Sequence, residues 1–143
     1  MIGGPLRPER LAMARVTGIG GIFLKARDPK ALGEWYRKHL GIDVQSWGGA
    51  SFSWEAGTTP ERPGVTVWSL FPESSTYFDP STARCMVNYR VLNLEALLRE
   101  LRAEGCSVDE RSESSEYGKF GWVMDPEGNR VELWEPPLGP PPG

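Results

Sequence analysis

The stretch YGKFGWVMDPEGNRVELWEPP, residues 117–137, decides the fold of this chain. Apolar residues recur on both sides of DPEGN, and a proline, a glycine and an asparagine within five residues favour a turn. The stretch therefore predicts a strand, a turn and a second strand. Glu132 stands in the second strand between Val131 and Leu133, an acid in a run that otherwise suits a protein core.

Two helices are expected, one in each half of the chain. Asp28 and Asn93 each stand at the start of a run with apolar residues three and four apart, and their side chains can accept hydrogen bonds from a first helical turn. Gly41 and Gly105 end the two runs, as glycine often does at a helix C-terminus. The two halves therefore repeat the same local pattern.

The strands flanking the helices repeat as well. The runs at 19–27, 51–57 and 65–72 correspond to those at 85–91, 119–125 and 131–137. A further strand after each helix, near 44–47 and 107–111, has the weakest signal. Each half then reads strand–helix–strand–strand–strand. This predicts an α+β fold in which two βαβββ modules pack edge to edge as an open mixed sheet with a cavity between them.

The folded unit is expected to be a single domain of residues 16–137. Module 1 spans about 16–72 and module 2 about 84–137. The first fifteen residues lack periodicity and are expected to be an irregular extension, and residues 138–143 form a proline-rich tail. The segment PESSTYFDPSTA between the modules is rich in turn residues and reads as a linker.

Composition limits the classes of partner and the location. The 143 residues carry a net charge of −3, which disfavours nucleic acid as the main partner. No apolar run suits a membrane span and no signal peptide is evident, so we predict a cytoplasmic protein with no membrane partner. Cys85 and Cys106 lack a metal or redox spacing and are expected to be free, largely buried thiols.

The repeat and two of its stretches resemble the vicinal oxygen chelate superfamily, which includes glyoxalase I, bleomycin-resistance proteins and extradiol dioxygenases. The stretches are LKARDPKALGEWYRKHLGI and FGWVMDPEGNRVELWEP, and the DPEGN turn followed by apolar–Glu–apolar carries most of the resemblance. It implies a small-molecule cavity between the modules and a homodimer. In the metal-dependent members, residues from the first and last strand of each module hold a divalent ion.

The resemblance places the four metal-ligand positions at Gly21, Thr66, Met86 and Glu132. Glycine supplies no ligand and a methionine thioether suits softer metals, so Glu132 is the one residue through which a divalent ion could bind. We therefore predict no cofactor. The sole histidine, His39, lies near the end of the first helix and is expected to face away from the cavity.

Strand alternation predicts which side chains share the cavity with Glu132. The predicted ligand-binding residues are Lys25, Thr66, Trp68, Asn88, Arg90, Glu132 and Trp134. Arg90 and Lys25 would hold an anionic group, and the rings would stack on a flat ligand. Glu132 would accept a hydrogen bond or serve as a catalytic general base. In the alternative interpretation, Glu132 forms an internal ion pair with Arg90 or Lys25.

Other aromatic residues have separate expectations. Tyr77 and Phe78 of the linker are expected near the cavity rim, closing over a ligand. Four more rings are expected in the core: Phe52, Trp54, Phe120 and Trp122.

Three functions follow from these residues. The leading hypothesis is a protein that binds a small anionic or aromatic molecule without a catalytic metal. The alternative is a metal-dependent or glutamate-based lyase, isomerase or dioxygenase of the glyoxalase I type. The third is an interaction module without a binding cavity.

Overall fold

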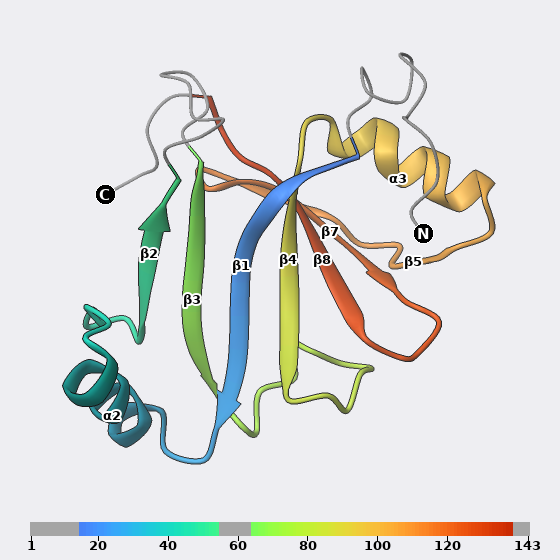
Figure 1. Ribbon diagram of the computed structural model, residues 1–143. Helices are drawn as coiled ribbons and strands as arrows, with labels where there is room; N and C mark the ends of the chain where they lie inside the picture. Colours follow the sequence, from blue (N-terminus) through green and yellow to red (C-terminus); the bar gives the residue numbers. More distant parts are fainter. Residues whose placement is uncertain (1–14, 55–63, 139–143) are drawn as a thin grey trace, which may run out of the picture.

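The computed structural model describes residues 15–54 and 64–138 (Figure 1). The elements in chain order are β1 (Val16–Ala26), α2 (Pro29–Leu40), β2 (Gly49–Ser53), β3 (Val65–Pro72), β4 (Cys85–Val91), α3 (Leu94–Ala103), β5 (Ser107–Val108), β6 (Glu113–Ser115), β7 (Gly118–Met124) and β8 (Arg130–Glu135).

The strands form one mixed sheet in the order β2-β3-β1-β4-β8-β7-β5, with β6 paired to β7. β1 and β4 run antiparallel at its centre and join the two halves of the chain (Figure 1). Each of these strands is also parallel to the last strand of its own half, β1 to β3 and β4 to β8. The predicted α+β class, with two modules in an open mixed sheet, is confirmed.

The helices start and stop at the predicted signals. The Asp28 side chain accepts from the backbone N–H of the third residue after it at 3.0 Å, and the Asn93 side chain does the same at 3.1 Å. α2 ends at Gly41, whose φ of 69° is left-handed and suits glycine. α3 ends at Ala103, two residues before Gly105. Local capping chemistry therefore fixes both helices.

Both helices pack on one face of the sheet, called here the helix-covered face. Near α2 its buried residues are Val44, Trp68 and Leu70. Near α3, Val91 of β4 and Leu133 of β8 are buried against Leu94, Leu97 and Leu98 of the helix. The β1–β4 register sets Leu24, which joins the α2 cluster, directly beside Cys85, and strand alternation places Tyr89 of the α3 cluster on the same face. The predicted amphipathic helices thus supply this part of the core.

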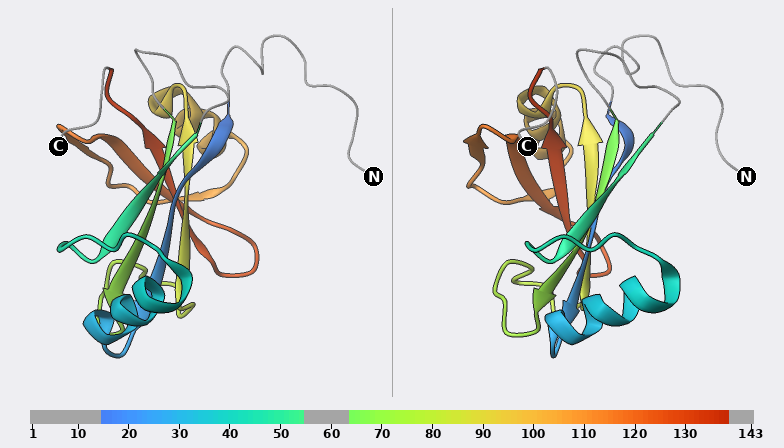
Figure 2. Two further views of the ribbon diagram at one scale, coloured as in Figure 1. Left: turned by 60° about the vertical axis from the view of Figure 1, so that its left-hand side comes forward. Right: turned by 90° about the vertical axis from the view of Figure 1, so that its left-hand side faces the viewer.

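The opposite face carries an aromatic cluster and is covered by the crossover segment, residues 73–84. Phe78, Met86 and Trp122 are buried in this cluster. Phe78 is 0% exposed, and Tyr77 stacks on Phe71 with ring centroids 5.6 Å apart. Figure 2 (right) shows α2 and the crossover segment on opposite sides of the sheet. The crossover segment is therefore a packed layer in addition to a connection.

The structure corrects the expected strands of module 1. In the described residues, 44–47 form no strand, and β2 begins at Gly49 and ends at Ser53 instead of spanning 51–57. Gly48 has a φ of 97°, and the Gln45 N–H donates to the Gly49 carbonyl at 2.7 Å. A tight turn thus occupies the place of the weakest predicted strand. In module 2 the corresponding strand is present as the short β5.

Two burial predictions are wrong. Cys85 and Cys106 are free, as predicted, but both are exposed. Cys85 starts β4 and Cys106 lies in the turn after α3, so neither reaches the core. Phe52 is 47% exposed because β2 is the last strand at one edge of the sheet.

The chain ends lie mostly outside the described residues, so the predicted extension and tail stay predictions. Arg15, the first described residue, pairs with Glu100 at 2.5 Å and with Glu104 at 2.7 Å, both near the end of α3. No helix in the described ranges is both long and apolar enough for a membrane span.

Candidate functional site

Glu132 is the centre of a buried polar cluster with Tyr77, Asn88 and Trp122, called here the Glu132 cluster. Its side chain is 1% exposed. Asn88 Nδ2 donates to Oε1 at 2.6 Å, Trp122 Nε1 donates to Oε2 at 2.9 Å, and the Tyr77 hydroxyl also donates to Oε2. The sheet register brings the strand residues together, because Asn88 of β4 and Trp122 of β7 stand beside Glu132 on the two flanking strands.

The electrostatics of this cluster are set by burial. Desolvation raises the pKa of the Glu132 carboxyl, and the three hydrogen bonds act in the opposite direction because they stabilise the charged form. Burial and the neighbouring Glu132 charge raise the pKa of Tyr77, so its phenol keeps its proton. Arg130, 4.8 Å from the Trp122 ring, helps to lower the Glu132 pKa. The carboxyl therefore has neutral donors for its direct partners.

These residues do not fit a divalent metal ion. Three N–H or O–H donors already point at the Glu132 carboxylate. Thr66 donates its hydroxyl to the Ile19 carbonyl at 2.5 Å, and Met86 is 1% exposed in the aromatic cluster. Residues 15–54 and 64–138 contain no group of three or more His, Cys, Asp or Glu placed to hold a metal. A catalytic ion usually needs three such ligands.

Of the predicted ligand-binding residues, the structure brings Asn88 and Glu132 into contact. The expectation that Trp68 faces the same way as Glu132 is wrong, because Trp68 packs on the helix-covered face against Tyr36, with ring centroids 4.9 Å apart. Thr66 lies two residues before Trp68 on β3, so its side chain also points to the helix-covered face and away from Glu132.

The register explains this error. Phe23 pairs with Ser69, and Asn88, its equivalent 65 residues later, pairs with Glu132. The equivalent of Glu132 in module 1 is therefore Ser69, three residues from the predicted Thr66. An odd shift along a strand places side chains on the other face of the sheet.

The remaining predicted residues lie apart from the Glu132 carboxylate. The Arg90 guanidinium is 5.5 Å from the Trp54 ring, and Lys25 Nζ is 5.1 Å from the Phe78 ring. The alternative prediction of a Glu132 ion pair with either cation is therefore wrong: its hydrogen-bond partners are neutral.

Trp134 stacks on Phe120, with ring centroids 6.3 Å apart, and donates from Nε1 to the Tyr117 carbonyl at 2.7 Å. His39 lies in the last turn of α2, as predicted, with its ring 5.1 Å from Trp35.

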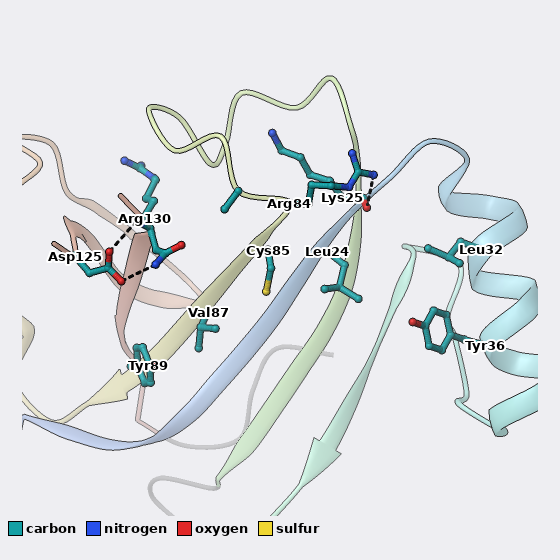
Figure 3. Close-up of a pocket in the computed structure, with 12 residues that line it drawn as sticks. Leu24, Lys25, Leu32, Tyr36, Arg84, Cys85, Val87, Tyr89, Asp125 and Arg130 are labelled. Atoms are coloured by element: carbon teal, nitrogen blue, oxygen red, sulfur yellow. Dashed lines mark hydrogen bonds between the residues drawn. The ribbon is translucent and has the colours of Figure 1, made fainter. Parts of the chain in front are cut away.

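A second feature, the helix-side groove, spans both modules on the helix-covered face (Figure 3). Its volume is about 560 Å³. The lining residues are Leu24 and Lys25 of β1, Leu32 and Tyr36 of α2, Ala83 and Arg84 of the crossover segment, Cys85, Val87 and Tyr89 of β4, and Asp125, Asn129 and Arg130 at the β7–β8 turn. Ligand pockets commonly have this size and this mainly apolar lining with a few polar groups.

The charged residues that line the groove are Lys25, Arg84, Arg130 and Asp125. Lys25 Nζ lies over the Phe78 ring, and Arg130 lies over the Trp122 ring and pairs with Asp109 at 3.2 Å, so both of these charges are directed to the opposite face of the sheet. The Asp125 carboxylate accepts from the Asn129 backbone N–H and side chain, both at 2.8 Å, and these bonds lower its pKa. Its charge is therefore partly offset within the turn. Arg84, whose side chain is 60% exposed, is therefore the cation most available to a ligand in the groove.

Sequence reasoning missed Tyr36, Arg84 and Tyr89 as groove residues. It placed the binding cavity between the modules, on the face of the sheet that carries Glu132. The two helices pack at opposite ends of the sheet, with the central strands β1 and β4 between them (Figure 1). The missed signal was the apolar alternation of Val87 and Tyr89 on a strand at the join of the modules.

The comparisons with known proteins agree with this architecture. A family model described as glyoxalase-like domain matches residues 21–134. Among solved structures, methylmalonyl-CoA epimerase from Mycobacterium tuberculosis is 24% identical with a TM-score of 0.54, over 85% of this chain and 89% of that one. A glyoxalase/bleomycin resistance protein/dioxygenase superfamily member from Vibrio splendidus is 16% identical, with a TM-score of 0.53, over 85% and 98%.

A Streptomyces coelicolor methylmalonyl-CoA epimerase variant in complex with 2-nitronate-propionyl-CoA is 16% identical, with a TM-score of 0.60, over 85% of this chain and 99% of that one. Such identities show a shared fold and leave the activity open. No curated protein sequence matches the chain. The family model covers most of the chain and fits both modules, so this protein belongs to the glyoxalase-like domain family, within the vicinal oxygen chelate superfamily.

Proposed function

We propose that this protein binds a small anionic molecule with an aromatic or apolar body in the helix-side groove, without a catalytic metal. The observation that carries the proposal is the lining of the groove, where Tyr36 and Tyr89 flank an apolar floor and Arg84, of the three cations that line it, carries its charge outside the aromatic cluster of the opposite face. Rings provide stacking area and guanidinium groups hold carboxylates or phosphates with paired N–H donors.

Arg84 is the best placed of these cations to meet a ligand. Its Nη2 donates to the Lys25 carbonyl at 3.2 Å, which fixes the guanidinium beside the Lys25 strand. Its ion pair with Glu73 is long, 3.4 Å, and both side chains are about half exposed. Such a surface pair contributes little and is readily exchanged for a ligand anion.

The ligand class also agrees with the nature of one structural neighbour. The Streptomyces coelicolor epimerase holds an acyl-CoA analogue on a similar fold. We carry over from it only the class of ligand, a small organic molecule.

Titration with 2-naphthoate, followed by its fluorescence or by calorimetry, tests the proposal. The wild-type chain should bind it, and Arg84→Ala should weaken binding about tenfold, the loss expected for one charge-assisted contact. The neutral analogue 2-naphthamide should bind more weakly than 2-naphthoate. Arg111→Ala is the matched control because Arg111 is 74% exposed and lies outside the groove lining. Equal affinity of wild type and Arg84→Ala would refute the assignment of the site.

Cys85 offers an independent readout, because it lines the groove and Cys106 does not. In a Cys106→Ser background, saturating 2-naphthoate should slow the reaction of Cys85 with a thiol reagent severalfold. In a Cys85→Ser background, the reaction of Cys106 should keep its rate. A ligand that leaves the Cys85 rate unchanged binds elsewhere.

Elemental analysis tests the metal-independent part separately. Protein purified without chelator, before and after addition of nickel, zinc, manganese or iron, should contain far less than one ion per chain. A stoichiometric ion would favour the alternative of a metal-dependent glyoxalase-type enzyme.

A further inference from the structure

We propose that the ligand of the helix-side groove is a phosphate monoester, whose phosphate is held by Arg84 and Arg27 together; this rests on the proposed function, because it concerns the same groove. Arg27 does not line the groove itself. Three features support its part in binding: a hollow that continues the groove, the backbone that links the two arginines, and the state of the acidic residues around them.

The hollow that continues the groove lies between the end of β1 and α2, and is called here the α2 extension. Its volume is about 600 Å³. It shares four lining residues with the groove, which are Lys25, Leu32, Tyr36 and Arg84. The residues that it adds are Ala26, Arg27, Asp28, Ala31 and Trp35. A ligand whose ring lies in the groove can therefore place a polar group in the extension.

The backbone holds the two arginines close to each other. Lys25 N–H donates to the Arg84 carbonyl at 2.8 Å, and Arg84 Nη2 donates back to the Lys25 carbonyl at 3.2 Å (Figure 3). Arg27 follows Lys25 by two residues, a length of chain that spans at most about 7 Å when extended. Both guanidinium groups can therefore meet one anion where the groove joins the extension.

The acidic residues nearby leave both arginines accessible to a ligand. In residues 15–54 and 64–138, no acidic side chain forms an ion pair with Arg27, which is exposed. Arg84 pairs with Glu73 across 3.4 Å, and their side chains are 60% and 48% exposed. Asp28 also lines the extension, but its Oδ1 accepts from the Ala31 N–H at 3.0 Å and caps α2. Glu73 is therefore the acid that a bound anion would replace.

Two guanidinium groups suit a phosphate better than a carboxylate. A phosphate monoester carries a charge of about −1.5 to −2 at pH 7 and has three acceptor oxygens, and each arginine presents paired N–H donors. A carboxylate carries one charge on two oxygens, which one arginine can satisfy. Arg84 therefore serves either anion, and Arg27 adds affinity for a phosphate.

Titration with two ligands that share one ring system tests the proposal. At pH 8, 2-naphthyl phosphate should bind about fivefold more tightly than 2-naphthoate, the upper end for a contact between exposed charges. Arg27→Ala should abolish this difference by weakening the phosphate about fivefold, and should leave the affinity for 2-naphthoate within about twofold. Equal affinity of the wild type for both ligands would overturn the proposal, as would an equal loss for both ligands in Arg27→Ala.

Two controls separate a phosphate site from a general effect of charge. Lys30→Ala is the matched variant, because Lys30 is also exposed and lies near Arg27 in the sequence but outside both linings. It should change neither affinity by more than about twofold, and a loss equal to that of Arg27→Ala would overturn the site. Inorganic phosphate, which lacks the ring, should bind far more weakly than the ester. Similar affinity would assign the site to free phosphate and overturn the ester.

Glu73→Gln provides a second readout, because Glu73 competes with the ligand for Arg84. This variant should bind 2-naphthyl phosphate about twofold to threefold more tightly than the wild type, and unchanged affinity would contradict the replacement of Glu73 by the phosphate. Binding of 2-naphthoate that depends on Arg84, without a preference for the phosphate, would refute the phosphate site and leave the proposed function standing. No binding of either ligand would refute both.

Discussion

The hydrogen bond from Tyr77 to Glu132 gives the sharpest prediction about stability. Tyr77→Phe removes the hydroxyl alone and leaves the ring stacked on Phe71. The Glu132 side chain is 1% exposed, so solvent gives the carboxylate no replacement partner without rearrangement. A hydrogen bond to a charged group contributes about 1.5–3 kcal/mol, so we expect a loss of about 2 kcal/mol in the free energy of unfolding at pH 8.

The loss should be smaller in acid. Burial raises the pKa of Glu132, so at pH 4 the carboxyl is mainly protonated in the folded protein. The bond from Tyr77 then joins neutral groups and contributes about 1 kcal/mol. The variant also loses an interaction that lowers the Glu132 pKa, so its carboxyl should titrate at a higher pH than in the wild type.

Urea unfolding at pH 4 and pH 8, with equal slopes required for the two proteins, measures both values. Tyr117→Phe is the control, since Tyr117 is 50% exposed, and it should change stability by less than about 0.5 kcal/mol. A loss below 0.5 kcal/mol at pH 8, or the same loss at both pH values, would refute the account of a charged, buried carboxylate held by the phenol.

Two further variants test the same region. Glu132→Gln removes the titrating carboxyl. A carboxyl whose pKa is raised on folding contributes stability that is full below its unfolded pKa of about 4.3 and is lost as the pH rises through its folded pKa. Between these two pKa values, the wild type should therefore lose stability relative to Glu132→Gln, by about 1.4 kcal/mol per unit of pKa shift. A pH-independent difference in urea unfolding would contradict this. Gly20→Ala would place a Cβ 2.4 Å from Asn88 Oδ1 and 2.7 Å from the Trp134 ring, and should cost about 1–3 kcal/mol in thermal or urea unfolding. A neutral effect would show that these two side chains yield freely.

The fold was predictable because its signals are local and occur twice. Asp28 and Asn93 cap their helices whatever packs around them, and apolar alternation marks the long central strands. The strand expected near Val44–Trp47 is absent because Gly48, which has a positive φ, and the Trp47 ring, which packs over Gly49, form a turn there. Such tertiary packing leaves no periodic signal in a sequence.

The site was less predictable because it depends on register. Asn88 and Glu132 were placed together correctly, because strand alternation from Met86 on β4 and from Glu132 on β8 agrees with the register in which these strands pair. Thr66 and Trp68 were misplaced because alignment of matching tryptophans gave an offset that the strands do not follow. The partner Tyr77 comes from the crossover segment, whose path over the sheet follows from no pattern in its turn residues.

The sheet order also constrains how the protein can be made. Of the described strands, β1 leaves the ribosome first and ends between β3 and β4, and β8 leaves last and ends between β4 and β7. The join of β4 to β7 must therefore wait for β8, because Asn88 and Trp122 meet their common carboxylate only when Glu132 emerges. A nascent chain that stalls before β8 carries an open β4 edge and an unfilled aromatic cluster, the kind of exposed surface that chaperones recognise.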